Sequence, residues 1–166
     1  MDRLWTPWRY QYITKSSPIP TTGPACIFCA KVKVSDDDSH LVVHRGTHNF
    51  VLLNLFPYSS GHLLIAPFEH VDSLAGAAPE AAMEMMQLAR RAETVLRQVY
   101  RCPGLNLGMN LGECAGAGVA GHIHLHVVPR WPGDANFMTT TAETRVLPED
   151  LAVTLQRVRG GWTAAA

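Results

Sequence analysis

The 166-residue chain has no long apolar run and no excess of charge of either sign. No segment approaches the ~20 apolar residues that span a bilayer, and the start MDRLWTPWRYQYITKSS lacks the apolar region of a signal peptide. Lys plus Arg and Asp plus Glu number 14 each, so no global field draws the protein to nucleic acid or to an anionic membrane. These absences predict a cytoplasmic protein that binds neither, with only local phosphate binding.

Cysteine is also scarce, and four residues do not suggest a disulfide framework. Two of them, Cys26 and Cys29, form a CxxC, which in the cytosol is typical of metal binding or redox chemistry. A redox CxxC starts a helix after a strand, whereas this one follows a proline-rich arm, which favours metal. Structural zinc takes four Cys or His ligands, and spacing alone does not choose the other two. The candidates are His44, His48, His70 and His122.

The composition, 47% hydrophobic and 17% charged, is typical of one compact domain. Residues 1–24 combine aromatic residues with several prolines, which predicts an irregular arm, and residues 25–166 are expected to form the single domain. Helices are predicted at 79–100 and near 148–159. Strands are predicted at 41–44, 49–56, 62–67, 104–111 and 121–131. Short links between neighbouring strands favour an α+β domain on an antiparallel sheet.

The segment 79–100 has the clearest helical signal. Pro79 suits the first helical turn, where its missing N–H costs nothing. Glu84, Arg91 and Gln98 are expected to face away from the core. The apolar stripe, with spacings of three and four, comprises Met85, Leu88, Ala89, Ala92, Val95, Leu96 and Val99.

The stretch GHIHLHVVPRW, at 121–131, alternates three histidines with aliphatic residues. Because side chains alternate along a strand, His122, His124 and His126 are expected to share one face. Neutral imidazole is a good nucleophile towards phosphorus, so three in a row can divide attack, charge stabilisation and orientation. A catalytic metal ion held by all three is the rival interpretation, since imidazole is the commonest metal ligand.

Just upstream, GECAGAG offers Gly112, Gly116 and Gly118 in a loop whose backbone can approach a ligand closely. Successive N–H groups in such a loop can form an anion nest, although most glycine loops only turn corners. Beside a triple-histidine strand, this loop predicts a phosphate cradle.

Together these motifs resemble the histidine triad (HIT) family, whose signature is His, apolar, His, apolar, His and two further apolar residues. The resemblance continues over roughly residues 3 to 148 in RLWTPWR, CIFC, NLFPYSSGHLLIAPFEHV, NLGMNLG, AGAG and PRWPGDANFM. These segments are similar to bacterial members related to diadenosine tetraphosphate phosphorylases and hydrolases. The resemblance implies an α+β HIT-like fold: a five-stranded antiparallel sheet with a long helix and a C-terminal helix, extended by homodimerisation.

The resemblance also implies roles for the histidines. His124 is expected to attack the α-phosphorus of a nucleotide and His126 to contact the phosphate oxygens, while His122 completes the catalytic row. His62 is expected to support the triad. The backbone N–H groups expected to face the same phosphate are those of Gly116, Ala117 and Gly118.

Further residues are implied to bind the nucleotide. Asn110 corresponds to a residue that touches the phosphate or the leaving group, and Asn54 to one that bonds the ribose hydroxyls. The base is expected to lie between Phe50, Leu52 and Ile65.

Some relatives, and the galactose-1-phosphate uridylyltransferases, carry zinc on positions that match Cys26, Cys29, His70 and His122. The resemblance therefore implies a structural zinc that fixes the arm and the first triad imidazole.

The implied activity is nucleotidyl transfer from a dinucleoside polyphosphate such as diadenosine tetraphosphate, through a nucleotidyl-histidine at His124, as phosphorylase or hydrolase. Adenosine phosphoramidase and a nucleotide-binding regulatory dimer with little turnover are the alternatives. The loop after Asn110 is one residue longer than in the small purine-nucleoside phosphoramidases, and Gly118 stands near the position where they carry Ser or Thr. This departure favours dinucleoside polyphosphates over phosphoramidates.

Overall fold

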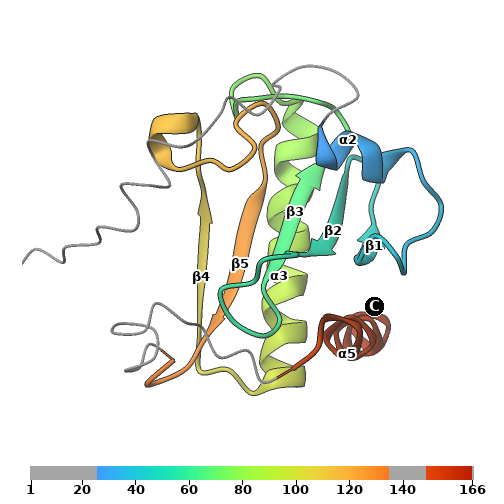
Figure 1. Ribbon diagram of the computed structural model, residues 1–166, viewed down its shortest axis with the longest axis vertical. Coiled ribbons are helices and arrows are strands. Elements are labelled where there is room, and N and C mark those ends of the chain that lie inside the picture. The colour runs from blue at the N-terminus through green and yellow to red at the C-terminus, as the bar shows by residue number, and fades with distance from the viewer. Residues whose placement is uncertain (1–25, 135–148, 166) are drawn as a thin grey trace, which may run out of the picture.

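Figure 1 shows the computed structural model, which describes residues 26–134 and 149–165. Five strands form one sheet in the order β1-β2-β3-β5-β4, and every neighbouring pair is antiparallel. The strands are β1 Val42–Arg45, β2 Asn49–Leu53, β3 Leu63–Pro67, β4 Gly104–Met109 and β5 Leu125–Arg130. The predicted α+β architecture is confirmed. The arm predicted over residues 1–24 lies outside the described residues.

The long helix α3 lies against one face of the sheet (Figure 1). It spans Pro79–Tyr100, as predicted, and α5, Leu151–Ala164, packs against α3 and β1. Six of the seven predicted stripe residues are buried, and Val99 is half-buried. Arg101 ends α3 in the left-handed conformation, with φ of 50°. In the part of the chain that the structure describes, neither helix combines the length and the apolar character needed to cross a bilayer.

Two charged residues of α3 that were expected to face away are tied into the fold. The Glu84 carboxylate accepts the backbone N–H groups of residues 47–49 at 2.6, 2.7 and 2.8 Å. Arg91 donates to the carbonyl of Trp162 at 2.7 Å and stacks on its indole. The expectation is therefore wrong for Glu84 and Arg91, because both reach polar groups at the edge of the core, whereas Gln98 is exposed as expected.

Replacing Glu84 with glutamine is expected to lower the free energy of unfolding by about 1 to 3 kcal/mol. The carboxylate serves three backbone donors and Asn49 Nδ2, whereas an amide has one acceptor oxygen and adds donors of its own. Chemical denaturation measures the difference. Glu80→Gln, at an exposed position one turn earlier, is the control and should leave stability unchanged. Equal stability of the Glu84 variant and the wild type would refute this role.

Two predicted strands are shorter in the structure by three residues or more. The strand predicted at 49–56 stops before Asn54, whose side-chain oxygen accepts a backbone N–H two residues further on at 3.1 Å and starts a turn. The strand predicted at 121–131 begins at Leu125, and the N–H of Ile123 bonds instead to the carbonyl of Val71 at 2.8 Å. The first two triad histidines therefore lie in the segment that leads into β5.

The final helix is displaced from its predicted position at 148–159. It begins after Asp150, whose carboxylate caps it by accepting the N–H of Ala152 at 2.8 Å, and it continues to Ala164. Gly161 lies so close to α3 that an added Cβ would be 2.6 Å from Val99 Cγ2. Close packing on α3 thus outweighs the poor helix propensity of glycine.

Alternation along β2 and β3 gives the sheet two buried faces. One face packs on α3 and contains Val51, Leu53, Leu63 and Ile65. The other face packs on α2, Ile27–Val32, and contains Phe50, Leu52, Leu64 and Ala66. His126 pairs with Leu64 across the β3–β5 ladder, so it shares this second face.

Candidate active site and metal centre

The CxxC motif lies at the start of α2. Cys26 is the N-cap residue and is buried, whereas Cys29 lies in the first turn and is half-buried. Redox chemistry was disfavoured at this motif because it follows a proline-rich arm and not a strand. The motif does start a helix, and the arm before it lies outside the described residues. The preference for metal binding therefore depends on what surrounds the two thiols.

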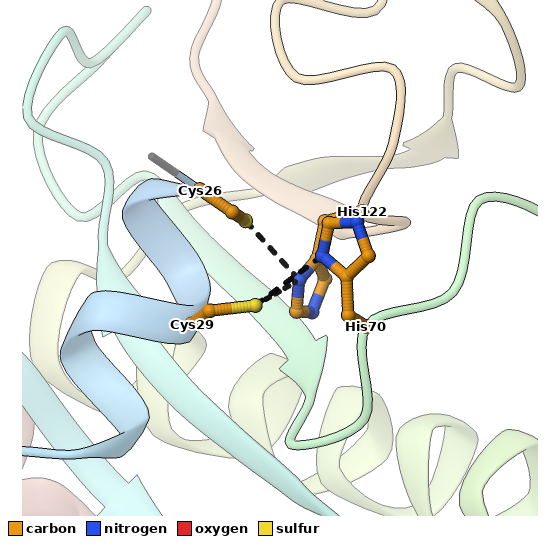
Figure 2. A group of neighbouring side chains, drawn as sticks. All are labelled: Cys26, Cys29, His70 and His122. Carbon is orange, nitrogen blue, oxygen red and sulfur yellow. Dashed lines mark hydrogen bonds between the residues drawn. The ribbon is translucent and has the colours of Figure 1, made fainter. Parts of the chain in front are cut away.

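Two histidines complete a four-residue cluster with these thiols (Figure 2). His70 follows β3, and His122 opens the triad segment. With Cys26 and Cys29 they place four possible ligand atoms within 4.8 Å of one another. His44 instead packs at a tilt against the Trp162 indole of α5, with ring centroids 5.5 Å apart. From the candidates that spacing left open, the structure brings together the two that the resemblance implied.

A backbone carbonyl determines which nitrogen of His122 faces the thiols. The carbonyl of Pro67 lies 2.9 Å from His122 Nε2, which must carry the proton because a carbonyl only accepts. The Nδ1 lone pair therefore faces Cys26 Sγ at 3.4 Å and Cys29 Sγ at 3.6 Å. Burial lowers the pKa of His122 to about 4. The ring is thus neutral at neutral pH, as metal ligation requires.

The donor set suits a closed metal site. Cys29 Sγ also lies 3.2 Å from His70 Nδ1, so two sulfur atoms and two imidazole nitrogens converge (Figure 2). Two cysteines and two histidines are a common ligand set of structural zinc, which leaves no coordination position open. The cluster can therefore hold a metal ion of this kind.

The middle histidine has the opposite tautomer. His124 Nδ1 donates to the carbonyl of His122 at 2.9 Å, which leaves the lone pair on Nε2. The side chain is 6% exposed, and burial lowers the pKa of His124, opposed in part by the hydrogen bond to that carbonyl. A neutral imidazole with an unprotonated Nε2 is a competent nucleophile.

The last triad histidine is held by a chain of hydrogen bonds that starts at a backbone N–H. Tyr58 N–H donates to His62 Nδ1 at 3.0 Å, so the His62 proton is on Nε2. His62 Nε2 donates to His126 Nδ1 at 3.0 Å, which leaves a proton on His126 Nε2. The Tyr58 ring also packs on both imidazoles, with centroids 4.8 and 6.1 Å away. His126 is thereby arranged to donate to an anion.

The triad does not present three lone pairs to one ion. His122 engages the Pro67 carbonyl and the thiols, whereas His124 and His126 engage a carbonyl and His62 through Nδ1. In the described structure only two ring nitrogens of the triad then lack such a contact. They are Nε2 of His124 and Nε2 of His126. A catalytic metal held by all three histidines is therefore not supported.

Acid is expected to weaken the fold through His126. Burial, followed by the charge of His124, lowers the pKa of His126 from 6.5 to about 4. Between these values the unfolded chain binds a proton that the folded chain does not, so this stability is complete above pH 6.5 and is lost as the pH falls towards 4. Thermal unfolding between about pH 7 and about pH 5 should depend more steeply on pH for wild type than for His126→Gln. If the unfolding temperatures of the two proteins depended equally on pH, this prediction would be wrong.

The glycine loop differs from the predicted anion nest. Gly116 follows the short 3-10 helix Glu113–Ala115 with φ of 88°, and its N–H donates within that turn at 2.9 Å. The N–H of Ala117 bonds to the carbonyl of Gly112 at 3.4 Å. A nest formed by these two N–H groups with that of Gly118 therefore requires the loop to rearrange.

The two asparagines that were expected to touch the nucleotide hold loops of the site. Asn110 Nδ2 donates to the carbonyl of Gly116 at 3.2 Å, which ties the glycine loop to the end of β4. Asn54 Nδ2 lies 3.4 Å from His62 Nδ1. Both side chains are half-buried. The structure thus brings Asn54 to the His62–His126 pair and Asn110 to the loop.

The predicted base pocket is only partly assembled. Phe50 and Leu52 lie on the histidine side of the sheet, but they are 0% and 2% exposed. Ile65 lies on the opposite face against α3, because successive strand residues alternate. The prediction is therefore wrong for Ile65, and its neighbour Leu64, which pairs with His126, occupies the face in question.

Three parts of the site were not found by sequence reasoning. Phe28, inside the CxxC, packs on two triad histidines, and Tyr58 packs on the third. Tyr58 could have been found from its position four residues before His62 in a tight turn, which brings the two side chains close together. The carbonyl of Pro67 carried no signal, since any residue supplies a carbonyl.

The fold and the site define an α+β protein built around neutral imidazoles of fixed tautomer beside a Cys₂His₂ cluster. The HIT domain family model matches residues 35–133. The chain belongs to the HIT family.

Similarity to individual proteins extends over most of the chain. The AP-4-A phosphorylase of Mycobacterium tuberculosis (strain ATCC 25618 / H37Rv) is 39% identical, covering 98% of this chain and 85% of the relative. The crystal structure of a zinc-bound histidine triad family protein from Mycobacterium smegmatis has a TM-score of 0.67 at 27% identity, covering 84% and 94%. A uridylyltransferase structure has a TM-score of 0.67 at 14% identity, covering 95% of this chain and 48% of that one, and shows the fold alone.

Proposed function

We propose that this protein is a HIT enzyme that acts on the α-phosphate of dinucleoside polyphosphates resembling diadenosine tetraphosphate, through a nucleotidyl-histidine at His124. The observation that carries the proposal is the His124 tautomer, because the bond from Nδ1 to the His122 carbonyl leaves a buried lone pair on Nε2. The similarity to an AP-4-A phosphorylase over nearly the whole chain supports this substrate class.

In the first step His124 Nε2 attacks the α-phosphorus. The N–P bond forms as the bond to the bridging oxygen breaks, and the remaining nucleoside polyphosphate leaves with that oxygen. Charge on the phosphoryl oxygens is stabilised by His126 Nε2–H, whose proton is directed outward by His62. The proton stays on His124 Nδ1, hydrogen-bonded to the carbonyl of His122, so attack requires no prior proton transfer.

In the second step an acceptor breaks the N–P bond. Inorganic phosphate gives a nucleoside diphosphate and water gives a nucleoside monophosphate, and both restore neutral His124. Asn54, beside His62, is proposed to bond the ribose, and Asn110 to place the glycine loop over the phosphate. The loop then supplies N–H groups after rearranging, with Gly118 among them.

The Cys26, Cys29, His70 and His122 cluster is proposed to hold structural zinc, supported by the convergence of its ligand atoms and by the zinc-bound structural neighbour. Zinc, when bound, would hold these four side chains together and would take no part in the reaction steps. His122 belongs to both systems, since its ring faces the thiols while its carbonyl sets the His124 tautomer.

A cytoplasmic homodimer is proposed as the working form. β4 is an edge strand of the described sheet, and Leu107 on it is 45% exposed. An open edge of this kind can pair with the same edge of a second copy and continue the sheet.

Product analysis with and without inorganic phosphate tests the proposed function. Diadenosine tetraphosphate incubated with protein and phosphate should yield ADP and ATP, and ADP formed only with phosphate identifies a phosphorylase. AMP and ATP in its absence identify a hydrolase. Adenosine 5′-phosphoramidate, assayed beside it, should turn over much more slowly. Preference for the phosphoramidate, or binding of AMP without turnover of any polyphosphate, would overturn the proposal.

A further inference from the structure

Phe28 lies between the two thiols in sequence and against two triad histidines in space. It is the buried residue of α2, with 1% of its surface exposed. Its ring centroid lies 5.1 Å from that of His122 and 4.9 Å from that of His124. One aromatic ring thus contacts both the imidazole that faces the thiols and the imidazole whose Nε2 lone pair no described residue engages.

We propose that Phe28 is a positioning residue that transmits the state of the cysteine–histidine cluster to the nucleophile His124. This inference rests on the proposed function, in which His124 attacks phosphorus and the cluster holds a metal. The cluster would then be connected to His124 in two ways. One is the Phe28 ring, and the other is the backbone carbonyl of His122, which accepts from His124 Nδ1.

The position of Phe28 depends on how the first turn of α2 is held. A helix of six residues is not stable alone, so each of its ends needs a tertiary anchor. The C-terminal end has one, because Arg45 donates to the carbonyl of Lys31 at 3.0 Å and the Lys31 ammonium donates to a carbonyl of the following loop at 2.8 Å. At the N-terminal end Cys26 makes no side-chain capping bond in the described structure. Phe28 packs edge-on against Phe50 at this end, and ligation of the two thiols would supply a polar anchor for the turn (Figure 2).

The ring of His124 needs a second constraint. Its hydrogen bond to the His122 carbonyl fixes one nitrogen, but a ring held at one atom can still tilt about that contact. Phe28 packs on the imidazole at an interplanar angle of 36° and limits the tilt. Because a displacement of about 1 Å at a reacting atom can cost about 100-fold in rate, loss of this contact should act on kcat.

A double-mutant cycle on the full-length protein tests this connection. The variants are Phe28→Leu, Cys29→Ser and the two combined, and the readouts are bound zinc, kcat and KM for diadenosine tetraphosphate, and the ¹⁵N shifts of His124. Phe28→Leu should keep its zinc and its KM, lose about tenfold or more in kcat, and show averaged ¹⁵N shifts of mixed tautomers. Cys29→Ser should lose zinc and show a similar fall in kcat, and the combined variant should be no slower than Cys29→Ser.

Phe68→Leu is the matched control, since Phe68 belongs to the same apolar cluster and stacks on Phe50 with centroids 5.6 Å apart. It should keep the kcat and the His124 shifts of the wild type. Phe28→Met serves if the leucine variant does not fold. Losses that multiply in the combined variant, or a Phe28 variant with a single His124 tautomer and unchanged kcat, would overturn the inference. The ¹⁵N shifts are measured on resting protein, so they test Phe28 even if the proposed reaction is wrong.

Discussion

Replacing His124 with alanine should lower kcat for diadenosine tetraphosphate by about 10⁴-fold or more while the protein stays folded. The residue supplies the only nucleophilic nitrogen in the proposed reaction, and its neighbours cannot replace it. His122 faces the thiols, and Nε2 of His126 carries a proton. Stopped assays with saturating substrate, together with thermal unfolding of the variant, measure both parts of the expectation.

His126→Gln is the matched comparison for this loss. Glutamine keeps an N–H donor but not the link from His62 Nε2, so the fall in kcat should be smaller, about 10²- to 10³-fold. A His124→Ala protein with near-wild-type kcat would remove the mechanism. If His124→Ala lowered kcat less than His126→Gln does, His126 and not His124 would be the nucleophile.

The second large effect is expected at the metal cluster. Cys26→Ser should lose the bound metal, lower the free energy of unfolding by about 3 kcal/mol or more, and lower Tm by roughly 10 °C. Cys26 is 2% exposed, and its Sγ lies 3.4 Å from His122 Nδ1. In the variant without metal, the imidazole lone pair and the serine hydroxyl are both buried and neither is bound to a metal ion. Metal analysis and thermal unfolding of the same preparations measure the change.

Cys114→Ser is the control for this substitution, because that thiol is exposed and lies outside the cluster. Its metal content and Tm should equal those of the wild type. Chelation of the wild type should reproduce the Cys26→Ser decrease and should have no further effect on the variant. Full metal content and unchanged Tm in Cys26→Ser would show that the cluster is not the metal site.

The regular elements could be predicted wherever one periodicity decides the structure. The stripe of α3 and the apolar runs of β2 and β3 bury their side chains as expected. The errors lie where tertiary contacts compete with local preference. Asn54 ends β2 by bonding to a turn, and Gly161 remains helical because it packs on α3.

The site could be predicted in its residue types but not in its hydrogen-bond directions. Sequence resemblance named His124 and the four cluster residues, and the structure gathers the cluster. It could not give the tautomers, because these depend on the carbonyls of Pro67 and His122 and on one N–H of Tyr58. Ile65 was misassigned by a single strand position, which moves a side chain to the opposite face of a sheet.

The most direct test of the account is chemical capture of the reaction intermediate. The protein is mixed with diadenosine tetraphosphate labelled at the α-phosphorus, denatured within the first turnover under conditions that preserve phosphoramidate bonds, and digested for mass spectrometry. The account predicts labelled AMP on the peptide that contains His124, and loss of that label when inorganic phosphate is added before denaturation. Products formed without label on that peptide at any time point, or label on another residue, would contradict it.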